Sequence, residues 1–364
     1  MTGLNGQRVY LDWNATAPLR PEARDAMLQA MDVVGNPSSV HGEGRAAKTV
    51  VEKARAQVAA LVGCAPDGIV FTGSATEAAA LACHGRTMAC TDLEHDAVVA
   101  HRTSKVDVSG DGVPDLGVVN TDVLAMQAAN SEMGLLQDNA TWAATARAAG
   151  ALVLVDAVHA AGKIRFNLDV LGADMLLISA HKIGGAKGIG ALCLASGVDV
   201  SAVVPGGGQE QGRRSGTENI PGIAAFGAAA AAAMADHEAG IWDGLYELRN
   251  LLEERIACAA PDTIFCARNN PRSPNTSCFA MPGWRGETQV MQMDLAGFAV
   301  SAGSACSSGK VNKASRVLLA MGFDEETASS AIRVSMGPTT TEAEVATFAD
   351  AWIDAYRRRE ARAA

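Results

Sequence analysis

The sequence predicts an α/β fold, with a large domain built on a mostly parallel sheet covered by helices and a smaller α+β domain after it. Short apolar runs alternate with amphipathic segments through the middle of the chain, as strand–helix units do. The chain has 364 residues, which is enough for two packed domains. Its 37 glycines suit the many tight turns that connect strands to helices in such folds.

The strands of the large domain are predicted from short apolar runs. Residues 69–71 (Ile-Val-Phe) predict a strand, and the Ala-rich segment from Glu77 predicts the helix after it. Residues 151–156, 175–179 and 189–194 predict three further strands. Ligands bind beyond the carboxyl ends of strands in these sheets. We therefore expect one shared site among the polar residues that follow the strands, which are Thr76, Asp156, Ser179, His181 and Lys182.

The pattern changes after Gly240. Residues 242–257 predict a long helix, and short strands, turns and a final helix follow. We predict a large domain over residues 14–238 and a small C-terminal domain over residues 239–364, with residues 1–13 packed on the small domain.

Composition excludes several classes of function. The net charge of −10 argues against tight direct binding of nucleic acid, which needs a basic surface. The longest apolar run, residues 223–235, is shorter than the roughly 20 residues of a membrane-spanning helix, so we expect a buried or interface helix and no membrane contact. The N-terminus lacks a secretory signal pattern, so we expect a cytoplasmic protein with reduced cysteines. The eight cysteines include no C-x-x-C pair, which argues against a structural zinc site.

Residues 73–77 (Gly-Ser-Ala-Thr-Glu) stand between a predicted strand and a predicted helix. Backbone N–H groups at a helix N-terminus, together with hydroxyl groups, form a phosphate site. An ordinary helix cap by Ser74 or Thr76 explains the same pattern. The segment alone does not distinguish the two.

Asp156 and Lys182 are the candidate cofactor residues. A carboxylate at the end of a buried strand is costly unless a cation faces it, and a pyridinium nitrogen is such a cation. A helix cap, or a metal site with His159, remains open for Asp156. A lysine in a partly desolvated site can form a Schiff base. The glycine-rich residues 183–190 do not fit a dinucleotide loop because a strand follows them, and Gly309-Lys310 fails the P-loop pattern.

Cys306 and Arg333 are candidates from the second domain. Residues 301–309 are small and mostly polar, which predicts a flexible, exposed loop and not a core strand. Cys306 in that loop is either a reactive thiol or an incidental linker cysteine, and composition favours neither. Arg333 alternates with apolar residues on a predicted strand, where an arginine either extends to the surface or binds a carboxylate with both nitrogens.

Taken together, these segments resemble the cysteine desulfurases of the nitrogen-fixation and iron–sulfur-cluster type, within the class V aminotransferases, which are pyridoxal-phosphate (PLP) enzymes of fold type I. The similarity begins at residues 10–18 (Tyr-Leu-Asp-Trp-Asn-Ala-Thr-Ala-Pro) and ends near Gly337, so it covers most of the chain. Further matching segments occur in the family's order at residues 35–39, 93–95, 206–210 and 214–219, besides those of Asp156, Lys182 and Cys306.

The resemblance implies a role for each site residue. Lys182 would carry the PLP Schiff base, Asp156 would pair with the ring nitrogen, and His95 would stack on the ring and assist proton transfer. Arg333 and Asn36 would bind the substrate. The remaining cofactor contacts would come from Ala75, Thr76, Ser131, His159, Ser179, His181 and, from the partner subunit of a homodimer, Thr217.

The implied reaction takes sulfur from L-cysteine, leaves L-alanine, and places a persulfide on Cys306. The sulfur would pass to an acceptor or scaffold protein in iron–sulfur cluster assembly or the synthesis of another thio-cofactor. Two departures stand out. His159 replaces the family's Gln and would add a titrating group, and Ser131 replaces an Asn. Another class V enzyme, such as an aminotransferase or selenocysteine lyase, is an alternative, as is a weakly active sulfur-relay partner.

Overall fold

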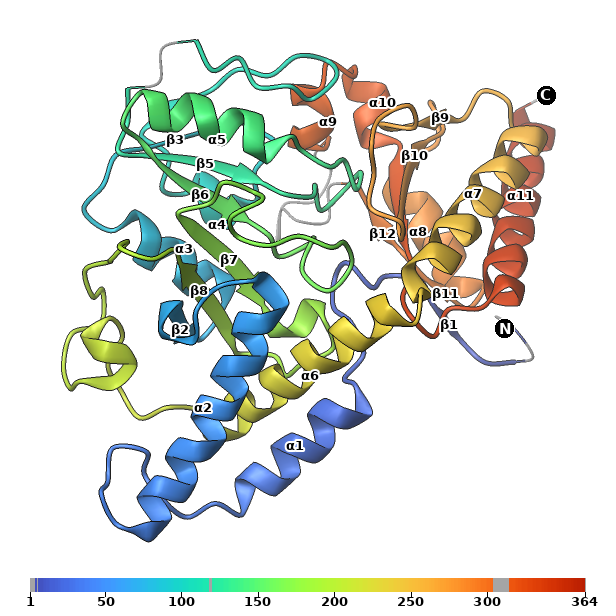
Figure 1. The fold of residues 1–364 in the computed structure, drawn as a ribbon. Helices are drawn as coiled ribbons and strands as arrows, with labels where there is room; N and C mark the ends of the chain where they lie inside the picture. The colour runs from blue at the N-terminus through green and yellow to red at the C-terminus, as the bar shows by residue number, and fades with distance from the viewer. Residues whose placement is uncertain (1–3, 5, 118–119, 304–313, 364) are drawn as a thin grey trace.

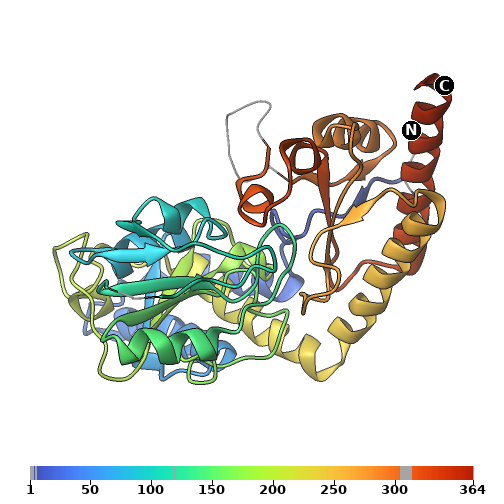
Figure 2. The same cartoon turned by 90° about the horizontal axis from the view of Figure 1, so that it is seen from above.

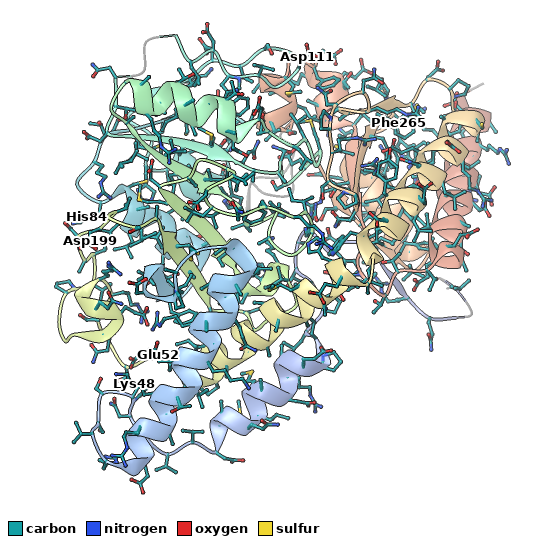
Figure 3. All side chains as sticks on the ribbon, viewed as in Figure 1. Lys48, Glu52, His84, Asp111, Asp199 and Phe265 are labelled. Atoms are coloured by element: carbon teal, nitrogen blue, oxygen red, sulfur yellow. The ribbon has the colours of Figure 1, made fainter. Side chains whose placement is uncertain are left out.

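The computed structural model describes residues 4, 6–117, 120–303 and 314–363. It contains a seven-stranded sheet covered by helices, and a smaller part with its own four-stranded sheet lies beside it (Figure 1). The predicted α/β fold is confirmed. Side chains fill the space between the two parts (Figure 3).

The large sheet is mostly parallel. Its strand order is β2-β8-β7-β6-β5-β3-β4, and β8 runs antiparallel to both of its neighbours, β2 and β7. The predicted strands are present, with bounds that differ by one residue at most. The seven strands are β2 (Ile69–Thr72), β3 (Met88–Cys90), β4 (Ser104–Lys105), β5 (Val123–Gln127), β6 (Leu152–Asp156), β7 (Met175–Ser179) and β8 (Gly190–Leu194).

Helices cover both faces of this sheet, which explains why its central strands are apolar throughout. One face packs against α1 (Pro21–Met31), α2 (Gly42–Val62), α5 (Asn139–Ala148) and α6 (Ile220–Glu238). The other face packs against α3 (Ala75–Cys83) and α4 (Asp96–Val99). The Ala-rich run lies in α6, and most of that helix is buried. Within the described residues, no helix is both long and apolar enough to cross a membrane.

The smaller part has an antiparallel sheet with the order β12-β13-β10-β9. Its strands are β9 (Ile264–Phe265), β10 (Thr276–Ala280), β12 (Ser301–Ala302) and β13 (Ala331–Ser335). Three long helices, α7 (Ile241–Ala259), α8 (Gly286–Leu295) and α11 (Glu342–Ala363), form its core with these strands. Two short helices, α9 (Arg316–Ala320) and α10 (Glu325–Ser329), complete it.

One prediction about residues 301–309 is wrong. Ser301 and Ala302 form a strand, because they pair with Arg333 and Ile332 of β13, and Ser301 is buried. Small polar residues predict a loop only where no neighbouring strand binds their backbone. Residues 304–313, which include Cys306, lie outside the described part of the chain.

The N-terminal segment packs on the smaller part and then crosses to the large sheet. β1 (Val9–Tyr10) pairs in parallel with β11 (Phe298–Ala299), and Val9 and Leu11 join the core of the smaller part. Further along, the Ala17 N–H donates to the carbonyl of His181. Helices α6 and α7 also connect the two parts (Figures 1 and 2). Gly240 separates them in a left-handed conformation that favours glycine. The domain bounds at residues 14 and 239 stay a prediction.

Candidate active site

A cavity of about 240 Å³ opens beyond the carboxyl ends of β6 and β7. It lies where ligands bind in sheets of this kind. Most of the predicted site residues line it, although they come from four separate segments of the chain. These residues are Ala75, Thr76, His95, Asp156, His159, Ser179, His181 and Lys182.

The N-terminus of α3 forms one wall of the cavity. Ser74 caps this helix by accepting a hydrogen bond from the Glu77 N–H at 3.2 Å, while Ala75 and Thr76 line the cavity. A Cβ atom at Gly190 would lie 2.6 Å from the carbonyl carbon of Ser74 and 2.7 Å from the Ala75 nitrogen. Glycine therefore lets β8 run directly beneath this turn. The helix cap is confirmed for Ser74, and it leaves the backbone of the next two residues at the wall of the cavity.

Asp156 ends β6 and contributes a carboxyl group to the cavity. One of its oxygens accepts a hydrogen bond from the Val158 N–H at 2.9 Å. Burial raises the pKa of this carboxyl, and the nearby His95 and Lys182 act in the opposite direction. A cation held against Asp156 would therefore be stabilised, as a pyridinium nitrogen would be.

His95 precedes α4 and caps it. Its Nδ1 accepts a hydrogen bond from the Ala97 N–H at 3.1 Å, so the proton of the neutral ring is on Nε2. The side chain is exposed at the edge of the cavity. A ring fixed in this way can donate a proton from one defined atom.

The other two histidines of the cavity are neutral. Burial lowers the pKa of His159 well below 6.5, and its Nδ1 has no hydrogen-bond partner among the described residues. Burial also lowers the pKa of His181 to about 4, and its Nδ1 lies 3.2 Å from the hydroxyl oxygen of Thr16. Burial therefore disfavours the charged form of the His159 ring, which opposes the titration expected for this residue.

Lys182 ends the short helix η2 (Ala180–Lys182), directly after β7. Its Nζ donates hydrogen bonds to the carbonyl oxygens of Asn14 at 2.6 Å and Ala15 at 3.0 Å. The N-terminal segment thus supplies the acceptors that hold this amine. Ser179, the last residue of β7, lies beside it and is buried.

Arg333 and Ser131 meet beside the cavity. The Arg333 side chain is 4% exposed and donates to the Ser131 carbonyl at 3.0 Å and to an Asp12 carboxylate oxygen at 2.9 Å. Its Nε is buried and has no partner among the described residues. Of the two alternatives for Arg333, extension to the surface is wrong, since the guanidinium is buried. One of its nitrogens binds the Asp12 carboxylate and another binds the Ser131 carbonyl, so no carboxylate is held by both nitrogens.

Two predicted residues lie apart from the cavity. Thr217 is exposed and lines a different hollow with Phe71 and Arg214. Asn36 is exposed, and its side-chain oxygen accepts from the Ser38 N–H at 2.9 Å. Neither residue lines the cavity that contains Lys182. Thr217 was expected to act from a partner subunit.

Sequence reasoning missed three residues that hold the site together. Asp12 pairs with Arg333, Asn14 accepts from Lys182, and Lys163 is 4% exposed and donates to the Asn14 side-chain oxygen at 2.7 Å. A charged or amide residue among apolar neighbours was the available signal, because burying such a group is costly unless it has a partner. Lys163 follows a mostly apolar run, so it carried this signal. Among the described residues, no group of three or more His, Cys, Asp or Glu could hold a metal ion.

The model of the family described as aminotransferase class-V matches residues 9–348. The chain belongs to this family. Its relatives include a cysteine desulfurase of Cereibacter sphaeroides, 39% identical with 93% of each chain covered. The cysteine desulfurase IscS of Dictyoglomus turgidum is 34% identical, with 92% of this chain and 91% of the relative covered.

Solved structures agree with the fold and the family. A NifS-like protein from Rickettsia africae is 31% identical and has a TM-score of 0.88, with 96% of this chain and 100% of that chain covered. The resemblance stated from the sequence is confirmed at the level of the family. The solved structure is aligned over nearly all of both chains, so it shares the overall fold of this chain.

Proposed function

We propose that this chain is a PLP-dependent cysteine desulfurase that converts L-cysteine to L-alanine and holds the removed sulfur as a persulfide on Cys306. The observation that carries the proposal is the convergence of Lys182, Asp156 and His95 on one cavity. A pyridine aldehyde cofactor needs a lysine for its aldehyde, a carboxylate for its ring nitrogen and an aromatic ring beside its own ring. The cysteine desulfurases among the relatives support the reaction class.

The residues of the cavity fit PLP. The N-terminus of α3, with Thr76, Ser179 and His181, would hold the phosphate; the first helical N–H groups favour an anion. Asp156 would face the ring nitrogen, and the unpartnered Nδ1 of buried His159 is available to a ring oxygen. Lys182 would join the cofactor covalently. When bound, PLP supplies an electron sink that makes the α-proton of an amino acid removable.

Lys182 would move the α-proton. Its Nζ already donates to two carbonyl oxygens, those of Asn14 and Ala15. These acceptors stabilise the protonated amine, which is the state that the lysine reaches once it has taken a proton. The N-terminal segment therefore favours Lys182 as a base, and His95 holds a second proton on Nε2.

Arg333 would bind the substrate carboxylate, as its buried and unpartnered Nε suggests. The Cys306 thiolate would then attack the substrate sulfur. A sulfur–sulfur bond forms, the carbon–sulfur bond breaks, and a proton completes L-alanine. We propose that the persulfide passes to an acceptor or scaffold protein, and that Thr217 reaches the cofactor of a partner subunit in a homodimer.

The experiment measures alanine and sulfide formed from L-cysteine with PLP and a reductant. It compares the wild type with Cys306→Ala and with a control, Cys258→Ala, which removes an exposed cysteine on α7. The proposal requires both products from the wild type and the control, and neither from Cys306→Ala. Sulfide release by Cys306→Ala would favour a lyase that needs no thiol. A coloured wild type without turnover would favour another class V reaction.

A further inference from the structure

The turn that carries His95 leads into a very short helix. It connects β3 to the four-residue helix α4, and His95 is exposed within it. A helix this short is marginal, so the cap that orients the ring needs support from elsewhere in the chain. One support is Glu94, whose carboxyl accepts from the Gln127 N–H of β5 at 3.0 Å.

A second support comes from the smaller part of the molecule. Arg316, the first residue of α9, donates to the backbone carbonyl of Asp92 at 2.5 Å and to that of Glu94 at 2.8 Å. The same guanidinium pairs with an Asp96 carboxylate oxygen at 2.7 Å. One side chain therefore binds the residue before His95, the residue after it and the start of the turn. Charge-assisted bonds of this kind are stronger and more directional than neutral ones.

Arg316 is itself held in place. Ser315 caps α9 by accepting from the Leu318 N–H, and its hydroxyl donates to the buried carboxyl of Glu132 at 2.5 Å. Leu318 also shares a buried apolar cluster with Leu93 of the His95 turn. The cap and the apolar contact together fix the backbone of α9 from which the Arg316 side chain extends. The partly exposed guanidinium therefore reaches the His95 turn from a fixed starting point.

We propose that Arg316 is a positioning residue that sets the orientation of the His95 ring, an inference that rests on the proposed function for its catalytic consequence. Its ion pair with Asp96 is partly exposed, and such pairs contribute little to stability. The two carbonyl bonds matter more, because they fix the backbone that leads into His95, at Asp92 and Glu94, and the Asp96 pair adds a contact on its other side. A ring displaced by even 1 Å from a proton-transfer geometry loses rate steeply.

The test uses three full-length variants. Arg316→Met removes every donor, and Arg316→Lys keeps the charge and a shorter donor. Arg255→Met is the matched control, because Arg255 on α7 forms an exposed pair with Asp350 on α11, and neither helix lines the cavity. The first readout is the ¹⁵N chemical shifts of the His95 ring in the cofactor-free protein, which report which nitrogen carries the proton. The second is kcat and KM for L-cysteine with PLP bound.

We expect a His95 proton on Nε2 in the wild type and a mixture of both tautomers in Arg316→Met. We also expect kcat of Arg316→Met to fall roughly 10- to 100-fold with little change in KM, and Arg316→Lys to recover part of the loss. Unchanged ring shifts in Arg316→Met, or equal losses in Arg255→Met, would overturn it. If Arg316→Met unfolds, the Arg316→Lys shifts decide. A wild type without turnover would refute the proposed function, while the ring shifts would still test the orientation.

Discussion

Lys163 and Lys182 donate hydrogen bonds to the same residue, Asn14. The Lys182 Nζ reaches its backbone carbonyl at 2.6 Å, and the Lys163 Nζ reaches its side-chain oxygen at 2.7 Å. Asn14 is 2% exposed, so the second lysine sits behind the first, away from solvent. Burial lowers the pKa of Lys163 well below 10.5, and the charges of Lys182 and Arg333 lower it further.

The buried amine of Lys163 predicts how stability depends on pH. Below its ordinary pKa, Lys163 is protonated in the unfolded chain and resists protonation in the folded one, so the unfolded state binds more protons. The free energy of unfolding therefore rises with pH up to about 10.5 and falls as pH decreases.

Lys163→Met removes this dependence. Urea unfolding at about pH 8 and pH 10 should give a smaller rise for Lys163→Met than for the wild type. Lys48→Met, an exposed lysine on α2 (Figure 3), is the control, and parallel curves for all three proteins would refute the prediction.

Asp12→Asn should destabilise the protein strongly. The carboxylate compensates Arg333, whose side chain is 4% exposed, and it also accepts from the Ser301 hydroxyl at 2.8 Å. Removing one partner of a buried ion pair costs roughly 3 kcal/mol, because the other charge stays buried without compensation. Asp350→Asn breaks the exposed pair with Arg255 and should cost less than about 1 kcal/mol. The free energies of unfolding in urea compare the two, and similar losses would contradict this account of Asp12.

Glu132 predicts a pH effect of the opposite sign to that of Lys163. Burial raises the pKa of this carboxyl from 4.5 to about 7, so between these values the folded state binds the extra proton. Stability from this group is present at the acid end and is lost as pH rises through about 7. Glu132→Gln should remove the effect, with a relative gain of up to about 3 kcal/mol above that pH. Chemical unfolding at acid and alkaline pH measures it. The exposed helical residue Glu247 serves as the control through Glu247→Gln, and a constant difference across pH would count against the prediction.

Gly190→Ala should weaken cofactor binding. Its Cβ would overlap the Ser74 backbone at 2.6 Å, so the N-terminus of α3 must shift. A displaced helix terminus holds a phosphate less well, and we expect at least a roughly tenfold loss of PLP affinity. Absorbance titration of the cofactor-free protein with PLP measures this loss. Gly244→Ala on α7 is the matched control, because a Cβ there meets no atom within 4 Å. Equal affinity in both variants would show that α3 tolerates the shift.

The local sequence pattern was enough to predict the central strands of the large sheet. The segments that form β6, β7 and β8 are apolar along their length because helices bury both faces of the sheet. Such a segment can be recognised in the sequence without knowing which strands pair with it. Residues at their carboxyl ends, such as Asp156 and Lys182, could therefore be assigned to one site in advance. Ser301–Ala302 was missed because its strand character comes from pairing with β13 and not from its own residues.

The sequence by itself determined the fold class, the family and the residues that converge on the cavity, because strand ends and short motifs are local features. Only the tertiary structure decided what surrounds them. Asp12 and Arg333 are separated by most of the chain, as are Glu94 and Arg316, and their contacts depend on how the smaller part packs on the large sheet. The same packing decides which groups lose water. Burial, which no local pattern measures, keeps His159 neutral and lowers the pKa of Lys163.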